Sequence, residues 1–322
     1  MPLLDQLAES GFLKISRSPD FDHFQSIEAL ADARSMPLDC RNFASSFAAV
    51  TLKSCSIYLQ QTFPRILQAR YFTTGAIVGF AMDDAVSIVL NGVEARVPAF
   101  LLAKGSAACE IVEPRANLVA FLNFESIADR GWPGEHDRAQ LIATQSAEYD
   151  ALRATTGDVL TLASKSPEVL LLPRMLENLE ESILQAVDHA VHAALPVVES
   201  KRSNLAHYLS LVRKLDEFLH SNASKTIYSA ELARQLGASV RTLHNAVVAI
   251  RGMSMHRYMR LRRLWGVRQQ LLRGASLQSI KAVALVNGFW HMGEFTASYR
   301  DLFGETPQQT LSADRKNTDS ES

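Results

Sequence analysis

The stretch GFWHMGEFTASYRDLFGETP, from Gly288 to Pro307, decides the fold because its pattern occurs twice in the chain. The first copy lies roughly 51 residues earlier. Each copy has a glycine, apolar residues at helical spacing, a second glycine and a hydroxyl residue: Gly237, Leu243, Val247, Ile250, Gly252 and Ser254, then Gly288, Phe295, Tyr299, Leu302, Gly304 and Thr306. Two units in register indicate a tandem duplication, and two are too few for a solenoid.

Each copy predicts two short helices joined by a tight turn. Ser229 and Ser276 are expected to cap the first helix of each copy, and Ser239 the second helix of the first copy. Gly237 and Gly288 supply the left-handed conformation that the turn requires. Helix, glycine turn and helix together predict a helix-turn-helix, whose second helix lies in a major groove of DNA.

An arginine-rich helix is predicted between the copies, from Ser254 to Arg273. Its ~18 residues span about 27 Å at 1.5 Å per residue, so it can hold two recognition helices about one DNA turn (~34 Å) apart.

The chain here resembles the AraC/XylS family of bacterial transcription regulators. The residues that carry the resemblance are Arg241-Thr242-Leu243, Gly252-Met253-Ser254, Arg257-Tyr258 and the run from Gly288 to Pro307, within about a third of the chain. The resemblance implies a transcription regulator, expected to be an activator, with double-stranded promoter DNA and RNA polymerase as partners and no cofactor.

The first recognition helix offers polar side chains suited to base edges. Arginine pairs with guanine and asparagine with adenine through two hydrogen bonds each. The predicted DNA-binding residues here are Ser239, Val240, Arg241, Thr242, His244 and Asn245. Matching the family's motif puts Arg241, His244 and Asn245 on base edges, and the alternative for each is a solvated surface side chain.

The second recognition helix departs from the family's pattern, because Gly293 and Ala297 stand where base-reading side chains are common. Its predicted DNA-binding residues are Trp290, His291, Met292, Gly293, Glu294, Thr296, Ala297 and Arg300. Positioning through phosphates, by His291, Thr296, Arg300 and the helix N-terminus, is the role that this pattern favours.

Charge divides the chain into an acidic and a basic part. Residues 1–200 hold 15 Lys and Arg against 25 Asp and Glu, a net charge of −10, whereas residues 201–311 hold 16 against 6, a net charge of +10. This asymmetry predicts a polyanionic partner for the C-terminal part only.

The upstream part predicts β structure, which makes the fold class α+β. Short β-like runs cover 47–59, 71–80, 86–90, 93–102 and 117–124, with turn signals that include Asn91-Gly92 and Lys104-Gly105. Closely spaced short strands favour a sandwich or barrel. The family resemblance implies a cupin-like β-barrel that senses a small molecule. The expected domains are a sensing domain (1–165), a dimerisation helix with linker (166–202), a DNA-binding domain (203–311) and a disordered tail (312–322).

An apolar stripe at helical spacing follows the predicted barrel: Leu172, Met175, Leu176, Leu179, Ile183, Val187, Val191 and Leu195. Such a stripe faces either its own barrel or the same stripe of a second chain. The resemblance favours a homodimer. The inter-domain linker is expected from Val197 to Asn204.

The effector is not identified by the sequence. Arg65, Arg70, Asp84 and Ser87 loosely follow a paired-arginine pattern that would suit a cyclic dinucleotide such as c-di-GMP, because arginines pair with phosphates and stack on guanine. The alternatives are another small metabolite for the barrel, and strand-end arginines without a ligand role.

Catalysis and membrane insertion are not expected. No histidine lies between His23 and His136, so a metal-dependent barrel enzyme lacks ligands, and the three cysteines have no metal-type spacing. No apolar run approaches the ~18 residues needed to cross a bilayer, and the N-terminus is unlike a signal peptide, so a cytoplasmic protein is predicted. The remaining alternatives are an architectural DNA-binding protein with a non-sensing barrel and a DNA-modifying enzyme.

Overall fold

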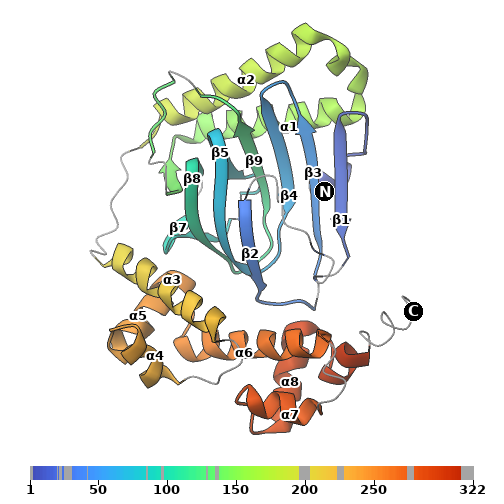
Figure 1. The fold of residues 1–322 in the computed structure, drawn as a ribbon. Coiled ribbons are helices and arrows are strands. Elements are labelled where there is room, and N and C mark those ends of the chain that lie inside the picture. Colours follow the sequence, from blue (N-terminus) through green and yellow to red (C-terminus); the bar gives the residue numbers. More distant parts are fainter. Residues whose placement is uncertain are drawn as a thin grey trace. The chain divides into compact units, whose positions relative to one another are not determined.

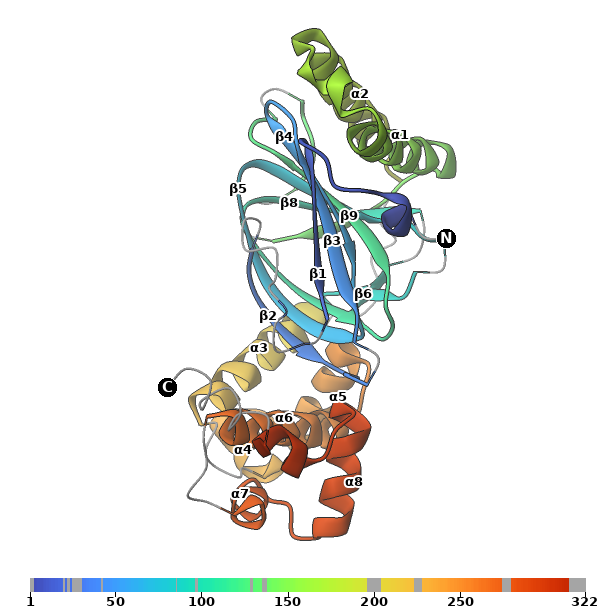
Figure 2. The ribbon, with the colours of Figure 1, turned by 90° about the vertical axis from the view of Figure 1, so that its right-hand side faces the viewer.

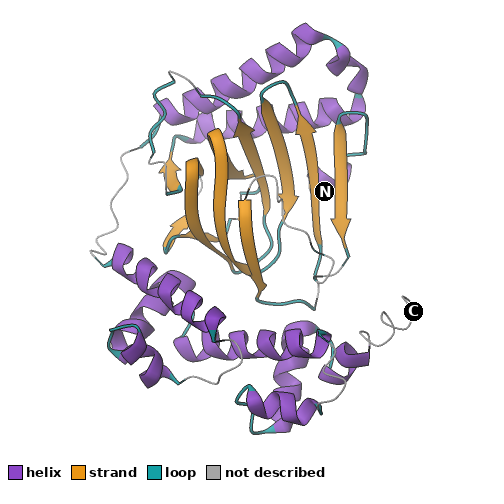
Figure 3. Cartoon of the chain, viewed as in Figure 1, coloured by secondary structure: helices purple, strands orange, loops and turns teal. Residues whose placement is uncertain are grey.

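A computed structural model describes residues 3–19, 21, 24, 31–41, 43–84, 86–95, 98–127, 130–134, 138–195, 204–222, 228–273 and 279–312. The chain forms two compact units, one of residues 1–37 and 43–200 and one of residues 38–42 and 201–322. The first unit carries all the strands of the described residues, and the second carries the helix-turn-helix copies (Figures 1 and 3). Most of the predicted linker from Val197 to Asn204, and the tail after Ser312, lie outside the described residues.

The first unit is built on one large antiparallel sheet (Figure 1). Its strands are β1 (Leu13–Ser18), β2 (Ala31–Pro37), β3 (Ser45–Thr51), β4 (Cys55–Gln61), β5 (Arg65–Ala81), β6 (Ile88–Leu90), β7 (Val93–Ala95), β8 (Ala99–Glu113), β9 (Leu118–Phe124) and β10 (Gln140–Ala143), preceded by the short helix η1 (Leu3–Gln6). The order is β1-β3-β4-β9-β5-β8-β6-β7, with β2 also on β5 and β10 on β8. Among the described strands β1 and β7 lie at the two ends of this order and do not pair with each other, so the sheet is not closed and the predicted cupin-like barrel is not confirmed.

The strand boundaries correct two predictions and confirm a third. The predicted run 47–59 is two strands, β3 and β4, that turn at Leu52, whose amide donates to the carbonyl of Cys55. The predicted turn at Lys104-Gly105 is wrong, because β8 continues through it. Gly105 has a φ of 59° opposite the register shift of β5, so it bends the strand as a bulge instead of ending it. The hairpin at Asn91-Gly92 is confirmed, with both residues at positive φ.

Two helices cover one face of this sheet (Figure 2). They are α1 (Ser146–Lys165) and α2 (Pro173–His192), joined by η2 (Pro167–Leu171). Ile183, Val187 and Val191 from α2 are buried in the core between helices and sheet. The apolar stripe is therefore mixed: its C-terminal half is intrachain core, whereas Leu172 and Leu195 at its ends are exposed. The opposite face of the sheet carries a second core, around β5 and β8.

The second unit is all helical in its described residues. It contains α3 (Leu205–Ser221), α4 (Ser229–Gln235), α5 (Val240–Arg251), α6 (Met255–Leu272), α7 (Ile280–Val286) and α8 (Met292–Phe303). No helix in the described part of the chain is long and apolar enough to span a membrane. The predicted Gly237 and Gly288 turns are confirmed, since both have positive φ.

The helix caps agree with the sequence only in part. Ser239 caps α5, accepting from the Thr242 amide at 3.0 Å. Ser229 does not cap α4, because the cap position falls on Tyr228. Ser279 caps α7, accepting from Ala282 at 3.1 Å, and the expected cap Ser276 lies outside the described residues. Short hydroxyl residues recur near helix starts, so the pattern finds these helices but misplaces two of the caps, by one residue at α4 and by three at α7.

Candidate DNA-binding surface and effector cavity

Helix α5 presents one buried and one open face. Leu243, Ala246, Val247 and Ile250 are buried, which fixes the helix on the unit's core. The predicted base-reading residues Arg241, His244 and Asn245 are all exposed, as are Ser239 and Val240, while Thr242 is half-buried. The structure thus brings the first set of predicted DNA-binding residues to a single solvent-facing helix start.

Helix α8 repeats this arrangement with less side chain on its open face. Phe295, Tyr299, Leu302 and Phe303 are buried. The exposed members of the second predicted set are Trp290, His291, Gly293, Glu294, Thr296, Ala297 and Arg300, and Met292 is half-buried. A side chain added at Gly293 would meet nothing within 4 Å, so the glycine leaves open space on this face.

A buried ion pair ties the first helix-turn-helix to its neighbours. The Asp216 carboxylate on α3 accepts hydrogen bonds from the Arg251 guanidinium at the end of α5 and from the Tyr258 hydroxyl on α6. Arg251 is only 1% exposed. Burial is the main cause that raises the pKa of Tyr258, with the Asp216 charge adding to it, so the hydroxyl stays a donor. Three helices are thereby locked together by one carboxylate.

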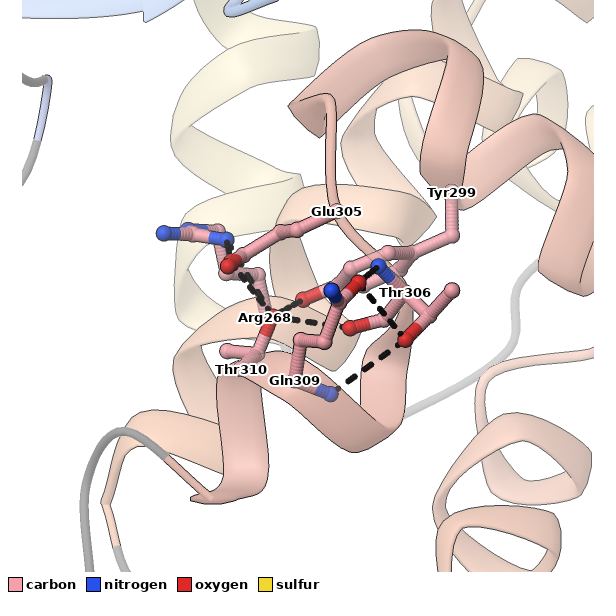
Figure 4. A network of polar contacts seen from close by, with 6 residues as sticks. All are labelled: Arg268, Tyr299, Glu305, Thr306, Gln309 and Thr310. Atoms are coloured by element: carbon pink, nitrogen blue, oxygen red, sulfur yellow. Dashed lines mark hydrogen bonds and ion pairs between the residues drawn. The ribbon is translucent and has the colours of Figure 1, made fainter. Parts of the chain in front are cut away.

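A second polar network ties the other end of α6 to the segment after α8 (Figure 4). Arg268 on α6 donates to Glu305, which also accepts from the Thr310 hydroxyl at 2.6 Å. The Tyr299 hydroxyl lies 2.8 Å from that of Thr310, and burial raises the pKa of Tyr299 to about 12. Each end of α6 is therefore fixed to one helix-turn-helix, which sets the spacing between the two recognition helices.

The first unit contains a cavity of about 60 Å³ at the core around β5 and β8. Its lining is apolar except for Arg65, Glu113 and the hydroxyl of Tyr149. The other lining residues are Leu67, Gly79, Phe80, Ala81, Val86, Ile88, Leu90, Ala95, Ala99, Leu101, Ile111, Val119, Phe121 and Leu141. The Arg65 Nε donates to the Glu113 carboxylate at 2.6 Å, and Thr62 and Asn117 donate to the same carboxylate. The Tyr149 hydroxyl donates to the Ala81 carbonyl at 2.9 Å. This lining has the composition of a small-molecule pocket, apolar with a few placed polar groups, but its volume is well below the roughly 300–1,000 Å³ of such pockets.

The predicted effector residues do not converge. Arg65 lines the cavity, but Arg70 is exposed and bonds to Ser106. Asp84 pairs with Arg153, and the Ser87 amide donates to Asn117. Since Arg65 and Arg70 are five residues apart on one strand, they point to opposite faces of the sheet. The sequence missed Glu113 and Tyr149, whose place on the cavity wall comes from strand pairing and helix packing.

Comparisons with known proteins match part of the chain. Residues 232–313 match a family model described as a helix-turn-helix domain. The probable thc operon regulatory protein of Rhodococcus erythropolis is 30% identical over 152 residues, 45% of this chain and 44% of that protein. The XylDLEGF operon transcriptional activator of Pseudomonas putida is 35% identical over 96 residues, 30% of each chain. The chain thus spans less than half the length of these curated relatives.

A similar solved structure is that of a probable AraC family transcriptional regulator from Rhodopseudomonas palustris. It is 34% identical and covers 33% of this chain and 97% of that one, with a TM-score of 0.29.

Proposed function

Because the chain belongs to the AraC/XylS family of transcription regulators, we propose that it is a sequence-specific DNA-binding regulator that activates promoters in response to a small molecule. The observation that carries this proposal is the pair of open recognition faces, on α5 and α8, held by buried networks at the two ends of one helix. Promoter DNA and RNA polymerase are the proposed partners, and the chemistry is binding and not catalysis.

The first prediction concerns the division of labour between the acidic and basic parts. A fragment of residues 203–311 is expected to bind DNA, because the positive charge and both helix-turn-helix copies lie within it. Its log affinity should fall with log salt concentration by about 0.9 per phosphate contacted. Fluorescence anisotropy over a salt series measures this, and a fragment of residues 1–200 that bound DNA equally well would contradict the proposal.

The cavity beside Arg65 and Glu113 is the proposed effector site. The cavity of about 60 Å³ would have to widen to hold even a small, largely apolar effector, whose polar group would then meet this ion pair. A cyclic dinucleotide, with two phosphates and two bases, would have to expand the cavity and compete with Glu113 for the arginine. That ligand stays a prediction, with the small apolar effector favoured over it.

The second prediction tests this cavity by filling it. A panel of small alkyl and aryl metabolites, with c-di-GMP alongside, is screened by thermal shift, since only a ligand of the folded state raises the melting temperature. Ala99→Leu should abolish the shift produced by the effector, because Ala99 lines the cavity. Ala143→Leu is the matched control, since Ala143 pairs with Ala99 across the strands and lies outside the cavity. A chain that no compound stabilises would favour the architectural DNA-binding alternative.

A homodimer is part of the proposal, and its proposed interface is at the start of the apolar stripe, where Leu171 of η2 precedes Leu172. Leu171 and Leu172 are 70% and 57% exposed, whereas Ile183 is fully buried in the chain's own core. The third prediction is that Leu171→Glu with Leu172→Glu yields a monomer in sedimentation, while Leu195→Glu, at the other exposed end of the stripe, leaves the dimer intact. Sedimentation as an unchanged dimer after the double substitution would place the interface elsewhere.

A further inference from the structure

A cleft of about 430 Å³ lies between the two helix-turn-helix copies of the second unit. It is lined by Tyr228, Ser229, His256, Met259, Arg260, Arg263, Gly288, Phe289, Trp290, His291, Glu294 and Phe295. The lining thus comes from three places: the start of α4 in the first copy, the connecting helix α6, and the turn and start of α8 in the second copy. Six of these residues lie outside the two recognition helices: four are on α6, and Tyr228 and Ser229 are at the start of α4.

The α6 residues form one continuous wall of the cleft. His256, Met259, Arg260 and Arg263 follow one another at spacings of three, one and three residues, so they lie on one side of the helix. Met259 is buried and supplies the floor, while His256 and Arg260 are exposed. Arg260 also donates to Ser298 of α8, which holds its guanidinium toward the second copy.

The cleft is basic and has aromatic edges. Among its lining residues two arginines and two histidines face a single acid, Glu294. Tyr228 and Trp290 are 62% and 69% exposed, which is unusual for such large apolar rings. Positive charge with exposed aromatic rings is the combination that receives a nucleic-acid backbone and packs on its sugars and bases.

We infer that this cleft receives the DNA backbone that runs between the two half-sites, with Arg260 and Arg263 on its phosphates and Trp290 against its sugars. The inference rests on the proposed function. Trp290, His291 and Glu294 line the cleft and also belong to the exposed start of α8, so DNA seated on α8 has its backbone beside the cleft. The first helix of a helix-turn-helix crosses the DNA backbone, and here that helix, α4, contributes Tyr228 and Ser229.

A functional consequence follows for the spacer between half-sites. The protein contacts it through backbone and groove shape, without reading base edges there. Its sequence therefore matters through the ease with which it adopts the shape that the cleft requires. The chain would discriminate between operators that share identical half-sites and differ in spacer stiffness.

The test uses the full chain and an operator obtained by selection from randomised duplex DNA. Methylphosphonates replace the spacer phosphates and remove their charge. We expect neutral spacer phosphates to weaken binding of the unsubstituted protein by ~10-fold. The double variant Arg260→Gln with Arg263→Gln should bind the unmodified operator about as weakly as the unsubstituted protein binds the methylphosphonate operator. Neutralising the spacer phosphates should then weaken binding of the variant little further. The slope of its log affinity against log salt concentration should be smaller by about two.

Arg257→Gln is the matched control, because Arg257 is an exposed arginine of the same helix that does not line the cleft. It should remain as sensitive to the neutral spacer as the unsubstituted protein. Acrylamide quenching adds an independent readout. The fluorescence of Trp290 is obtained as the difference between the unsubstituted protein and Trp290→Phe. We expect acrylamide to quench it in the free protein and not in the DNA complex.

Two outcomes separate the inference from its premise. Tight binding to the selected operator, with unchanged affinity on the neutral spacer and Trp290 still quenchable, overturns the role of the cleft and leaves the proposed function standing. Selection that enriches no sequence overturns the proposed function and the cleft with it. If the cleft binds a peptide or a small anion instead of the DNA backbone, the first of these outcomes is expected.

Discussion

Replacing Asp216 by alanine is expected to lower the free energy of unfolding of the helical unit by about 3–5 kcal/mol. The substitution removes the carboxylate that accepts from both Arg251 and Tyr258, so the 1%-exposed guanidinium keeps its charge without its acidic partner in a place that water does not reach. The cost of such a buried charge exceeds that of an exposed ion pair, for which about 0–1 kcal/mol is typical.

Urea unfolding followed by tryptophan fluorescence measures this loss. Trp265 and Trp290 lie in the helical unit and Trp132 in the other, so the experiment is made in a Trp132→Phe background. Glu217→Ala is the matched control, since Glu217 is the exposed acidic neighbour on the same helix, and it should change stability by less than ~0.5 kcal/mol. Equal effects of the two substitutions would show that the Asp216 cluster does not hold the helices together.

The parts of this fold that the sequence predicted are those encoded over short distances. Gly237, Gly288 and the Ser239 cap act within a few residues, and the apolar spacing of α5 and α8 is visible in single turns of helix. The duplication strengthens these signals, because the same spacing of glycine and apolar residues occurs in both copies.

The parts that the sequence missed depend on partners far along the chain. Asp216 lies 35 residues from Arg251, and Arg65 lies 48 residues from Glu113, so neither pair has a local pattern. From the sequence, an arginine within a strand is expected to be exposed. Arg65 is buried because the pairing of β5 with β8 places Glu113 beside it. The apolar stripe of α2 showed which face is buried, but periodicity is the same whether the partner is the chain's own sheet or a second chain.

The two recognition helices are expected to differ in what they read. Arg241 is exposed at the start of α5, where its forked guanidinium can pair with guanine, so Arg241→Ala should cost about 1–3 kcal/mol on the selected operator and relax base preference at one position. Arg300 is exposed near the end of α8, away from the helix start that we propose enters the groove. Arg300→Ala should weaken specific and non-specific binding alike and lower the salt slope by about one.

The contrast follows from the small side chains on α8. Gly293 and Ala297 are exposed on the face of α8 where base-contacting side chains are expected, and a Cβ at Gly293 would meet nothing within 4 Å. Few side chains are therefore available to read bases in the second half-site. Binding selections on operators with one half-site randomised at a time measure the information in each. A second half-site as tightly specified as the first would show that His291, Met292 or Glu294 reads bases. In that case the low sequence specificity of the second half-site, predicted from Gly293 and Ala297, would be wrong.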